Sequence, residues 1–315
     1  MEKQSKIYVA GHRGLVGSAL IRHLQEKGYN NIIYRTSHEL DLRNQAAVIQ
    51  FLAQEKPDYI FLAAAKVGGI LANATYPAQF LYDNLMIQSN VIEAAKEFGA
   101  KKLVFLGSTC IYPKMAPQPL KEDYLLTGEL ESTNEPYALA KIAGIKMCSS
   151  YNKQYGTEFI SVMPTNLYGP NDNFNLETSH VLPALMRKIH KAKINGEEAV
   201  TIWGSGTPLR EFLHVDDMAS ACVYLMENCT FEQIGEFVNI GTGKELTIRE
   251  LAETLCEIIG FEGELRFETT KPDGTPRKLT DVTKLHGLGW HHKIELKEGV
   301  QDTYKWYLEN VNDYE

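Results

Sequence analysis

A glycine-rich turn stands where a short apolar strand meets the first helical segment, and this junction constrains the fold more than any other feature. Gly11, Gly14 and Gly17 follow the strand-like run 6–10 and open a helical run over 14–27. Glycine allows a tight turn and lets backbone amides approach a pyrophosphate at the positive end of the helix. The position between a strand and a helix therefore predicts a dinucleotide-binding turn.

The first half of the chain alternates strand-like and helix-like segments. The strand-like runs cover residues 6–10, 31–36, 59–64, 102–107 and 158–163, and the helical runs cover 14–27, 45–54, 79–98 and 136–155. Alternation of this kind predicts parallel strands joined by right-handed crossovers. We therefore expect an α/β fold class, with a Rossmann-type doubly wound parallel sheet.

The alternation loosens at a loop rich in Pro, Gly and Asn over residues 164–171, which indicates a domain seam. Further helices are expected over 180–191, 215–227, 247–259 and 298–309. We expect residues 1–167 to form the dinucleotide-binding domain, with a returning segment at about 213–243. Residues 168–212 and 244–315 should form a smaller α/β lobe that binds the substrate.

The composition excludes several classes of protein. The 315 residues include 40 acidic and 32 basic side chains, so the net charge of −8 argues against a general nucleic-acid binder. The apolar runs are too short to span a membrane, and the start of the chain shows no secretory segment. The five cysteines form no C-x-x-C pair, so we expect no disulfide framework and no metal site. A cytoplasmic location fits best.

Three residues predict a centre that handles a carbonyl group. Tyr137 and Lys141 form a Y-x-x-x-K pair one helical turn apart. A nearby ammonium favours tyrosinate, which makes the phenol a better proton donor and acceptor. Ser108 follows the strand-like run 102–107, where active-site groups of such sheets gather. Together with the glycine turn, this set predicts a nicotinamide-dependent oxidoreductase.

The end of the second predicted strand bears on the choice of cofactor. An NAD site usually has a carboxylate there, whereas this sequence reads Tyr-Arg-Thr-Ser over 34–37. Arg13 and Arg35 are suited to pair with a 2′-phosphate, so we expect NADP(H). Glu39 keeps NAD open as an alternative. Asp41 fits a contact with the adenine end of the cofactor, or the N-cap of the helix that follows.

Longer segments carry a family resemblance. They are the runs 63–70 (AAAKVGGI), 110–113 (CIYP), 134–137 (NEPY), 164–170 (PTNLYGP), 203–206 (WGSG), 210–212 (REF) and 271–278 (KPDGTPRK). Together they cover nearly the whole chain and resemble the GDP-L-fucose synthases of the extended short-chain dehydrogenase/reductase family. Two departures are Thr109, where serine is frequent, and Ser37, where some bacterial members have a basic residue.

The resemblance implies epimerisation of GDP-4-keto-6-deoxy-D-mannose at C3 and C5, followed by NADPH-dependent reduction at C4. It assigns the two epimerisation acid/base groups to Cys110 and His180, without saying which serves which carbon. From the residues alone, Cys110 fits a buried apolar residue and His180 the start of a helix. A thiol and an imidazole can both transfer protons near neutral pH.

The resemblance also implies the residues that bind the two ligands. For the cofactor they are Gly11, His12, Arg13, Gly14, Leu15, Val16, Gly17, Arg35, Ser37, Asp41, Leu42, Ala63, Ala64, Leu106, Gly107, Ser108, Tyr137, Lys141, Pro164, Thr165, Asn166, Leu167 and His180. For the nucleotide sugar they are Ser108, Thr109, Asn166, Lys188, Trp203, Arg210 and Asp273. Alternatively, Lys188 and Arg210 are solvated surface cations, Trp203 fills the lobe, and Asp273 shapes a Pro-Asp-Gly turn.

Two other functions remain open at this point. One is another nucleotide-sugar enzyme, such as a UDP-sugar 4-epimerase that retains NAD, against which Cys110 and His180 argue. The other is a catalytically silent dinucleotide sensor, which we would expect to lack Tyr137 or Lys141. The resemblance further implies a homodimer, in which the helices expected over 79–98 and 136–155 pair between subunits.

Overall fold

A six-stranded parallel sheet forms the centre of the larger domain in this computed structural model, which describes residues 1–176, 178–270 and 273–310. Its strands are β1 (Ile7–Ala10), β2 (Ile32–Ile33), β3 (Tyr59–Leu62), β4 (Lys102–Leu106), β5 (Phe159–Pro164) and β10 (Val238–Ile240). Their order is β10-β5-β4-β3-β1-β2. The chain therefore reverses direction across the sheet between β1 and β3, which is where open α/β sheets bind ligands.

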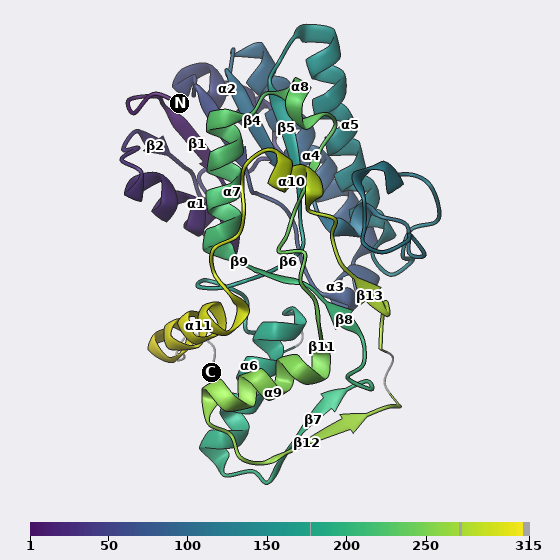
Figure 1. Cartoon of the computed structure of the whole chain (residues 1–315). Coiled ribbons are helices and arrows are strands. Elements are labelled where there is room, and N and C mark those ends of the chain that lie inside the picture. Colours follow the sequence, from purple (N-terminus) through teal and green to yellow (C-terminus); the bar gives the residue numbers. More distant parts are fainter. Residues whose placement is uncertain (177, 271–272, 311–315) are drawn as a thin grey trace.

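Helices cover both faces of this sheet (Figure 1). One face packs on α1 (Leu15–Glu26) and α7 (Val215–Asn228), and the other on α2 (Gln45–Glu55), α4 (Pro77–Glu97) and α5 (Glu135–Tyr155). Alternate residues of β1 serve the two faces, because Ile7 and Val9 belong to one core and Tyr8 and Ala10 to the other. Strands buried on both sides explain the continuous apolar runs in the sequence.

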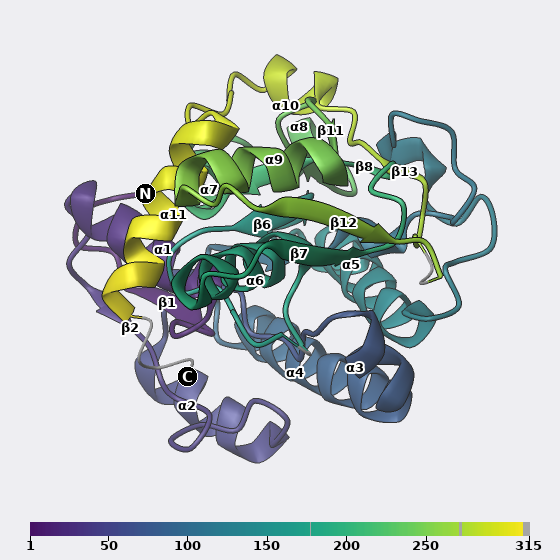
Figure 2. The same cartoon turned by 90° about the horizontal axis from the view of Figure 1, so that it is seen from below.

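A smaller lobe lies below the sheet in Figure 1 and is seen from beneath in Figure 2. It contains α6 (Val181–Asn195), α9 (Ile248–Ile259) and α11 (Leu296–Asn310), with β7 (Ala199–Trp203) paired in parallel to β12 (Glu264–Glu268). These elements share a separate hydrophobic core that includes Met186, Leu251 and Tyr307.

Short strands join the two parts. β6 (Asn166–Tyr168) pairs with β9 (Phe212–His214), and β8 (Leu209–Arg210) lies between β11 (Leu246–Thr247) and β13 (Arg277–Lys278). The other elements are α3 (Ile70–Thr75), η1 (Thr109–Ile111), η2 (Glu122–Tyr124), α8 (Phe231–Ile234) and α10 (Thr283–Gly287). The span 213–243 contains α7, which covers one face of the central sheet, and β10, which forms its edge.

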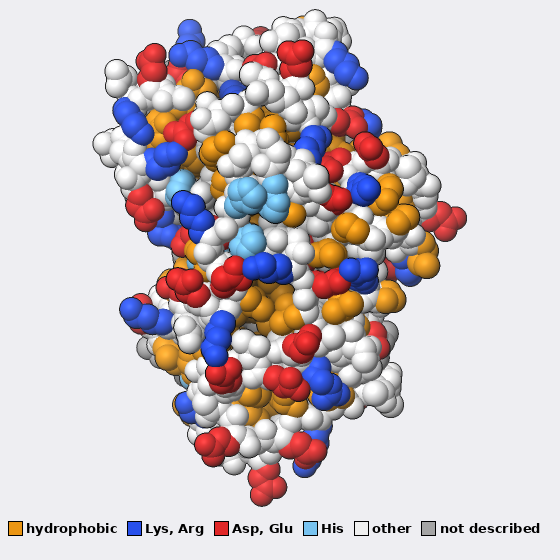
Figure 3. Space-filling model, in the orientation of Figure 1, with side chains coloured by type: hydrophobic (Ala, Val, Ile, Leu, Met, Phe, Trp, Pro, Cys, Tyr) orange, Lys and Arg blue, Asp and Glu red, His pale blue; other side chains and the backbone are white. Residues whose placement is uncertain are grey.

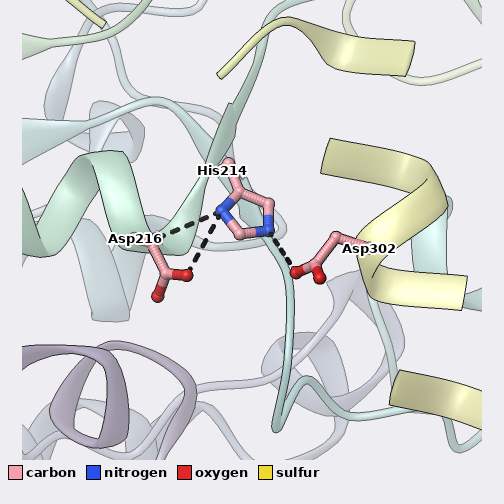
Figure 4. A group of neighbouring side chains, drawn as sticks. All are labelled: His214, Asp216 and Asp302. Atoms are coloured by element: carbon pink, nitrogen blue, oxygen red, sulfur yellow. Dashed lines mark hydrogen bonds and ion pairs between the residues drawn. The ribbon is translucent and has the colours of Figure 1, made fainter. Parts of the chain in front are cut away.

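A buried histidine marks the junction (Figure 4). His214 Nδ1 accepts a hydrogen bond from the Asp216 backbone N–H at 3.3 Å, and Nε2 lies 3.6 Å from an Asp302 carboxylate oxygen. Asp302 belongs to α11, so the C-terminal helix meets the strand that leads back into the larger domain. Asp216 is also held by Arg22 at 2.6 Å. The two carboxylates lie near opposite ring nitrogens of His214, and one possible ligand atom of each of the three residues lies within 4.8 Å of the others.

The structure departs from the sequence predictions in two places. The second strand, expected over 31–36, is reduced to Ile32–Ile33, and the chain beyond it borders a cavity. Residues 244–315 were expected in the lobe, with the return to the larger domain at about 213–243, whereas Leu285 and Trp290 also pack in the core of the larger domain. Their apolar side chains cover the α7 side of the sheet. Lys271 and Pro272, part of one motif, lie outside the described residues.

The surface carries both signs of charge. Figure 3 shows Lys and Arg side chains interspersed with Asp and Glu over one face. Among the described residues, no helix combines the length and the apolar character needed to cross a membrane.

Candidate active site

A cavity of about 910 Å³ opens at the carboxyl edge of the sheet, between the two parts of the molecule. Most predicted cofactor residues line it, namely Gly11, Gly14, Leu15, Val16, Gly17, Arg35, Ser37, Asp41, Leu42, Ala63, Ala64, Leu106, Gly107, Ser108, Tyr137, Lys141, Pro164, Thr165, Asn166, Leu167 and His180. Thr109 and Cys110 line it as well. Stretches that are far apart in the sequence therefore come together around one cavity.

The glycine turn fits a dinucleotide. Gly11 has φ +87°, and a Cβ there would lie 2.7 Å from the Ala64 backbone nitrogen. A Cβ on Gly17 would lie 2.1 Å from the Gly11 carbonyl oxygen, so both positions require glycine. Gly14 is the N-cap of α1, and no described side chain caps the amides of this helix or places an acid in its first turn. Those amides are the donors that would hold a pyrophosphate.

The residues predicted to choose between NADP and NAD divide into two groups. Arg35 lines the cavity, and its guanidinium donates to Glu55 at 3.0 Å while lying over the Phe51 ring. Glu39 accepts from the Thr36 backbone N–H at 2.7 Å and from its hydroxyl at 2.8 Å. Glu39 thus closes a local turn, and it is absent from the residues that line the described cavity. This arrangement favours the arginine over the carboxylate as the ribose contact.

Two neighbouring predictions have different outcomes. His12 and Arg13 lie outside the lining of the cavity, and the His12 ring stacks on Tyr34 with centroids 4.4 Å apart. Asp41 lines the cavity but forms an ion pair with Arg43 at 2.8 Å. The N-cap that the sequence allowed for Asp41 belongs instead to Asn44, which accepts from the Ala47 backbone N–H.

Ser108, Tyr137 and Lys141 meet at one point of the cavity. Ser108 follows β4 and caps η1, and its hydroxyl hydrogen-bonds Tyr137. Lys141 is one turn further along α5, only 3% exposed, and donates to the Leu106 carbonyl at 2.8 Å. A serine and a phenol on one carbonyl oxygen form a donor pair suited to an oxyanion.

Burial changes the proton affinities of this trio. Burial lowers the pKa of Lys141 to about 7. Burial, with a smaller electrostatic contribution from Cys110, raises the pKa of Tyr137 above its usual range, against the Ser108 hydrogen bond that lowers it. The sequence predicts that an ammonium shifts Tyr137 toward tyrosinate, whereas here the protein interior favours the neutral form of both groups. Tyr137 is therefore a proton donor in this state.

Cys110 and His180 reach the same cavity from different parts of the chain. Cys110 lies in η1 behind Ser108, and His180 is the N-cap residue of α6. Asn134 Nδ2 is 3.4 Å from the Cys110 sulfur, and Lys278 Nζ is 3.9 Å from it. Both donors would stabilise negative charge on that sulfur. Burial, assisted by the charge of Lys278, lowers the pKa of His180, so this imidazole is neutral at pH 7.

The predicted substrate residues of the small lobe form a second group outside the lining of the cavity. The Lys188 ammonium lies 5.1 Å from the centre of the Trp203 ring, and Trp203 is 65% exposed. Burial lowers the pKa of Lys188 and of Arg210. Asp273 accepts from the Ser205 backbone N–H at 2.6 Å and from its hydroxyl at 2.8 Å. Asp273 therefore holds the loop that follows Trp203, whereas the predicted Pro-Asp-Gly turn includes Pro272, which lies outside the described residues.

Sequence reasoning missed Lys278, which links the two groups. It lines the cavity beside Cys110, and its strand β13 lies next to β8 with Lys278 opposite Arg210. Lys66, Arg43 and Asp83 also line the cavity and were not singled out. Lys66 follows β3, so its place at a strand end was available as a signal. Lys278 ends the run 271–278 that carries the resemblance, but its strand of two residues gave no periodic signal that it faces the cavity.

Comparison with known proteins identifies the family of the chain. Residues 7–241 match the model of the NAD dependent epimerase/dehydratase family. The chain is 62% identical over 310 residues to GDP-L-fucose synthase 1 of Arabidopsis thaliana, across 98% of this chain and 95% of that one. It is 55% identical over 320 residues to the GDP-L-fucose synthase of Escherichia coli (strain K12), across 100% and 99%.

A solved structure of a related GDP-sugar enzyme has the same fold. The GDP-D-glycero-L-gluco-heptose synthase of Campylobacter jejuni, crystallised in the presence of NADPH, superimposes with a TM-score of 0.92 at 43% identity, covering 98% of this chain and 99% of that one. The chain belongs to the NAD dependent epimerase/dehydratase family. Its relatives confirm the predicted resemblance, fold class and class of enzyme, and the NADPH of the Campylobacter structure agrees with the predicted cofactor.

Proposed function

We propose that this protein converts GDP-4-keto-6-deoxy-D-mannose to GDP-L-fucose with NADPH, through epimerisation at C3 and C5 and reduction at C4. The observation that carries the proposal is the meeting of Cys110 and His180 with Ser108 and Tyr137 in one cavity. A simple reductase needs only the second pair, so the first pair calls for a further proton-transfer step. The names of the plant and bacterial relatives support the same reaction.

One ketone serves all three steps. C3 and C5 flank the C4 carbonyl, so loss of a proton from either carbon builds negative charge on the C4 oxygen. Ser108 and Tyr137 would stabilise that charge by hydrogen bonds. Cys110 and His180 would remove and return the protons on the two faces of each carbon. The neutral imidazole of His180 is ready to accept a proton at pH 7.

The same oxygen pair completes the reduction. A nicotinamide held by the residues that line the cavity would supply the hydride for C4. Tyr137 gives its proton to the C4 oxygen, and the raised pKa of its phenol keeps that proton in place until then. Lys141, one turn from Tyr137 on α5 and in the lining of the cavity, would hold the cofactor ribose. Arg35 would pair with the 2′-phosphate, exchanging its present partner Glu55 for the stronger anion.

The small lobe would hold the GDP end. Arg210 and Lys188 suit the diphosphate, since both cations are partly removed from water and the nearby carboxylates only partly offset that effect on their pKa. Trp203 offers an exposed ring for the guanine. Asp273 would act by fixing the turn that follows Trp203.

The decisive experiment mixes the protein with GDP-4-keto-6-deoxy-D-mannose in deuterated water, with NADPH and with NADH in separate reactions. We expect GDP-L-fucose that carries deuterium at C3 and C5, formed faster with NADPH. A product without label at either carbon would show a reductase and remove the epimerase half. Turnover of a UDP-sugar with retained NAD would establish the 4-epimerase instead, and binding of NADPH without turnover would establish a silent sensor.

We further propose that the protein is a cytoplasmic homodimer that pairs through α4 and α5. These long helices pack on each other and expose Tyr82, Leu139 and Tyr155, which are 59%, 43% and 51% exposed. Light scattering coupled to size exclusion tests this. We expect a dimer that Leu139→Asp converts to a monomer, whereas the exposed Leu308→Asp on α11 leaves it dimeric.

A further inference from the structure

Glu211 holds a buried carboxylate at the place where the two parts of the molecule exchange strands. It stands between β8 and β9 and is 0% exposed. β8 pairs with β13 of the small lobe, whereas β9 pairs with β6, which continues the chain from β5 of the central sheet. A residue at this point contacts both the substrate-binding and the cofactor-binding parts.

The carboxylate is satisfied by the backbone of two other segments. Oε1 accepts from the backbone N–H groups of Thr242 at 2.6 Å and Gly243 at 2.8 Å. Oε2 accepts from the Thr280 backbone N–H at 2.9 Å and from its hydroxyl at 2.6 Å. A Cβ on Gly241 would lie 2.3 Å from Oε1, so glycine makes room for the carboxylate. A buried acid needs such donors, and they fix its position.

The backbone of Glu211 reaches the cavity from the other side. Its carbonyl accepts from Asn166 Nδ2 at 2.8 Å and from the Thr165 hydroxyl at 3.4 Å. Asn166 and Thr165 line the cavity next to the end of β5. Glu211 thus holds Asn166 through its backbone and, through its side chain, the segment at Thr280 that follows the cavity residue Lys278.

We propose that Glu211 is a positioning residue, which keeps Arg210 and Lys278 in register with Asn166 so that the nucleotide sugar reaches Ser108 and Tyr137 correctly. Arg210 precedes it directly and lies opposite Lys278 in the β8–β13 pair. A shift of the carboxylate would move both cations relative to the central sheet. The inference rests on the proposed function, because it assigns the nucleotide sugar to this path.

The test compares Glu211→Gln with Glu250→Gln, which makes the same change at an exposed capping glutamate that also accepts from a threonine N–H and hydroxyl. In Glu211→Gln the side-chain amide would turn its NH₂ group toward N–H and O–H donors. We expect kcat/KM for the nucleotide sugar to fall about 100-fold, as misplacement of a substrate can cause. Binding of GDP should weaken, while NADPH binding, measured by its fluorescence, should stay near that of the control.

A second pair of variants, with smaller changes, tests the proposal even if Glu211→Gln does not fold. Thr280→Val removes one donor to Glu211, and Thr303→Val removes an equally buried hydroxyl in α11. We expect about tenfold loss of kcat/KM for the first and none for the second. Unchanged kinetics in both Glu211→Gln and Thr280→Val would overturn the proposal, and so would equal losses of NADPH and GDP binding. If the wild type binds GDP without turnover, the proposed function fails, and the effect of Glu211→Gln on GDP binding still decides the positioning role.

Discussion

The site residues of the larger domain and those of the small lobe are supported in different ways. On the larger domain, the glycine turn, Ser108 and Asn166 each follow a strand of one continuous parallel sheet, and Tyr137 and Lys141 lie on a long helix packed against it. On the small lobe, Arg210 and Lys278 lie on strands of two residues that pair across a long stretch of chain. The proposed reacting groups therefore have a rigid support, whereas Arg210 and Lys278 depend on connections such as Glu211.

This difference separates the expected kinetic effects. Under the proposed function, groups on the sheet act on the C4 oxygen, so their loss should lower kcat. Groups on the lobe would act on the nucleotide, whose contacts are alike in the ground state and the transition state, so their loss should raise KM.

The largest effect is expected for Tyr137→Phe. Without the phenol proton, reduction should slow about 10³-fold, in the range seen for loss of a general acid. Binding of NADPH and of GDP should not change. Tyr151→Phe, on the same helix but bonded to Glu93 away from the cavity, is the control. Single-turnover oxidation of NADPH measures the step, and a rapid Tyr137→Phe variant would remove this residue from the mechanism.

Arg210→Gln tests the opposite side. A charge-assisted bond contributes about 2 kcal/mol, so we expect KM for the nucleotide sugar to rise about 30-fold with little change in kcat. Arg266→Gln, an exposed arginine of β12 paired with Glu264, should change neither constant. Steady-state kinetics with both variants measure the effect. A fall in kcat for Arg210→Gln, in place of a rise in KM, would contradict the expected difference between lobe and sheet residues.

The same contrast explains what the sequence could predict. The sheet and its helices follow from local patterns, because each buried strand and each helix shows its own period. The glycine turn, Ser108 and the Tyr137–Lys141 pair belong to such elements, so their meeting at one sheet edge was predictable. The reduction of the second strand to Ile32–Ile33 was not, since its β-rich residues continue into the loop that borders the cavity.

The features that the sequence could not predict depend on contacts between residues far apart in the chain. Lys278 lies beside Cys110 only because β13 pairs with β8, and a strand of two residues has no period to detect. Leu285 and Trp290 return to the larger core although their surroundings in the sequence belong to the lobe. The opposing effect of burial on Tyr137 and Lys141 also needs three-dimensional structure, because spacing gives proximity but not desolvation.

Lys141 should reveal a conflict between stability and function on the rigid side. The pKa of Lys141 is about 7 in the folded state and about 10.4 in the unfolded state. Its burial therefore costs no stability above the unfolded pKa, where the amine is neutral in both states, and destabilises the folded state increasingly as pH falls toward 7. Lys141→Met should therefore stabilise the cofactor-free protein by about 1–2 kcal/mol near neutral pH, after loss of the Leu106 hydrogen bond. The gain should shrink toward pH 10, and activity should be lost. Urea unfolding at both pH values measures it; a gain independent of pH would contradict the cause.

The smallest effect is expected where α11 meets the junction strand. Burial lowers the pKa of His214, and the nearby Asp216 and Asp302 oppose that shift. Because the folded pKa is depressed, stability is present above the unfolded value near 6.5 and is lost as pH falls through the folded one. Asp302→Asn removes one opposing charge, so it should cost about 0.5 kcal/mol in acid and nothing above neutrality, since Asp302 is more than half exposed.

Glu309→Gln, an exposed change on the same helix, is its control. Unfolding free energies measured on either side of neutrality should diverge between the two variants only in acid. Equal curves would show that the charge of Asp302 does not hold α11 at the junction. The contact of Gly299 with Tyr168 and the His214 ring, and the hydrogen bond from the Tyr168 hydroxyl to the Leu296 carbonyl, would then hold it there.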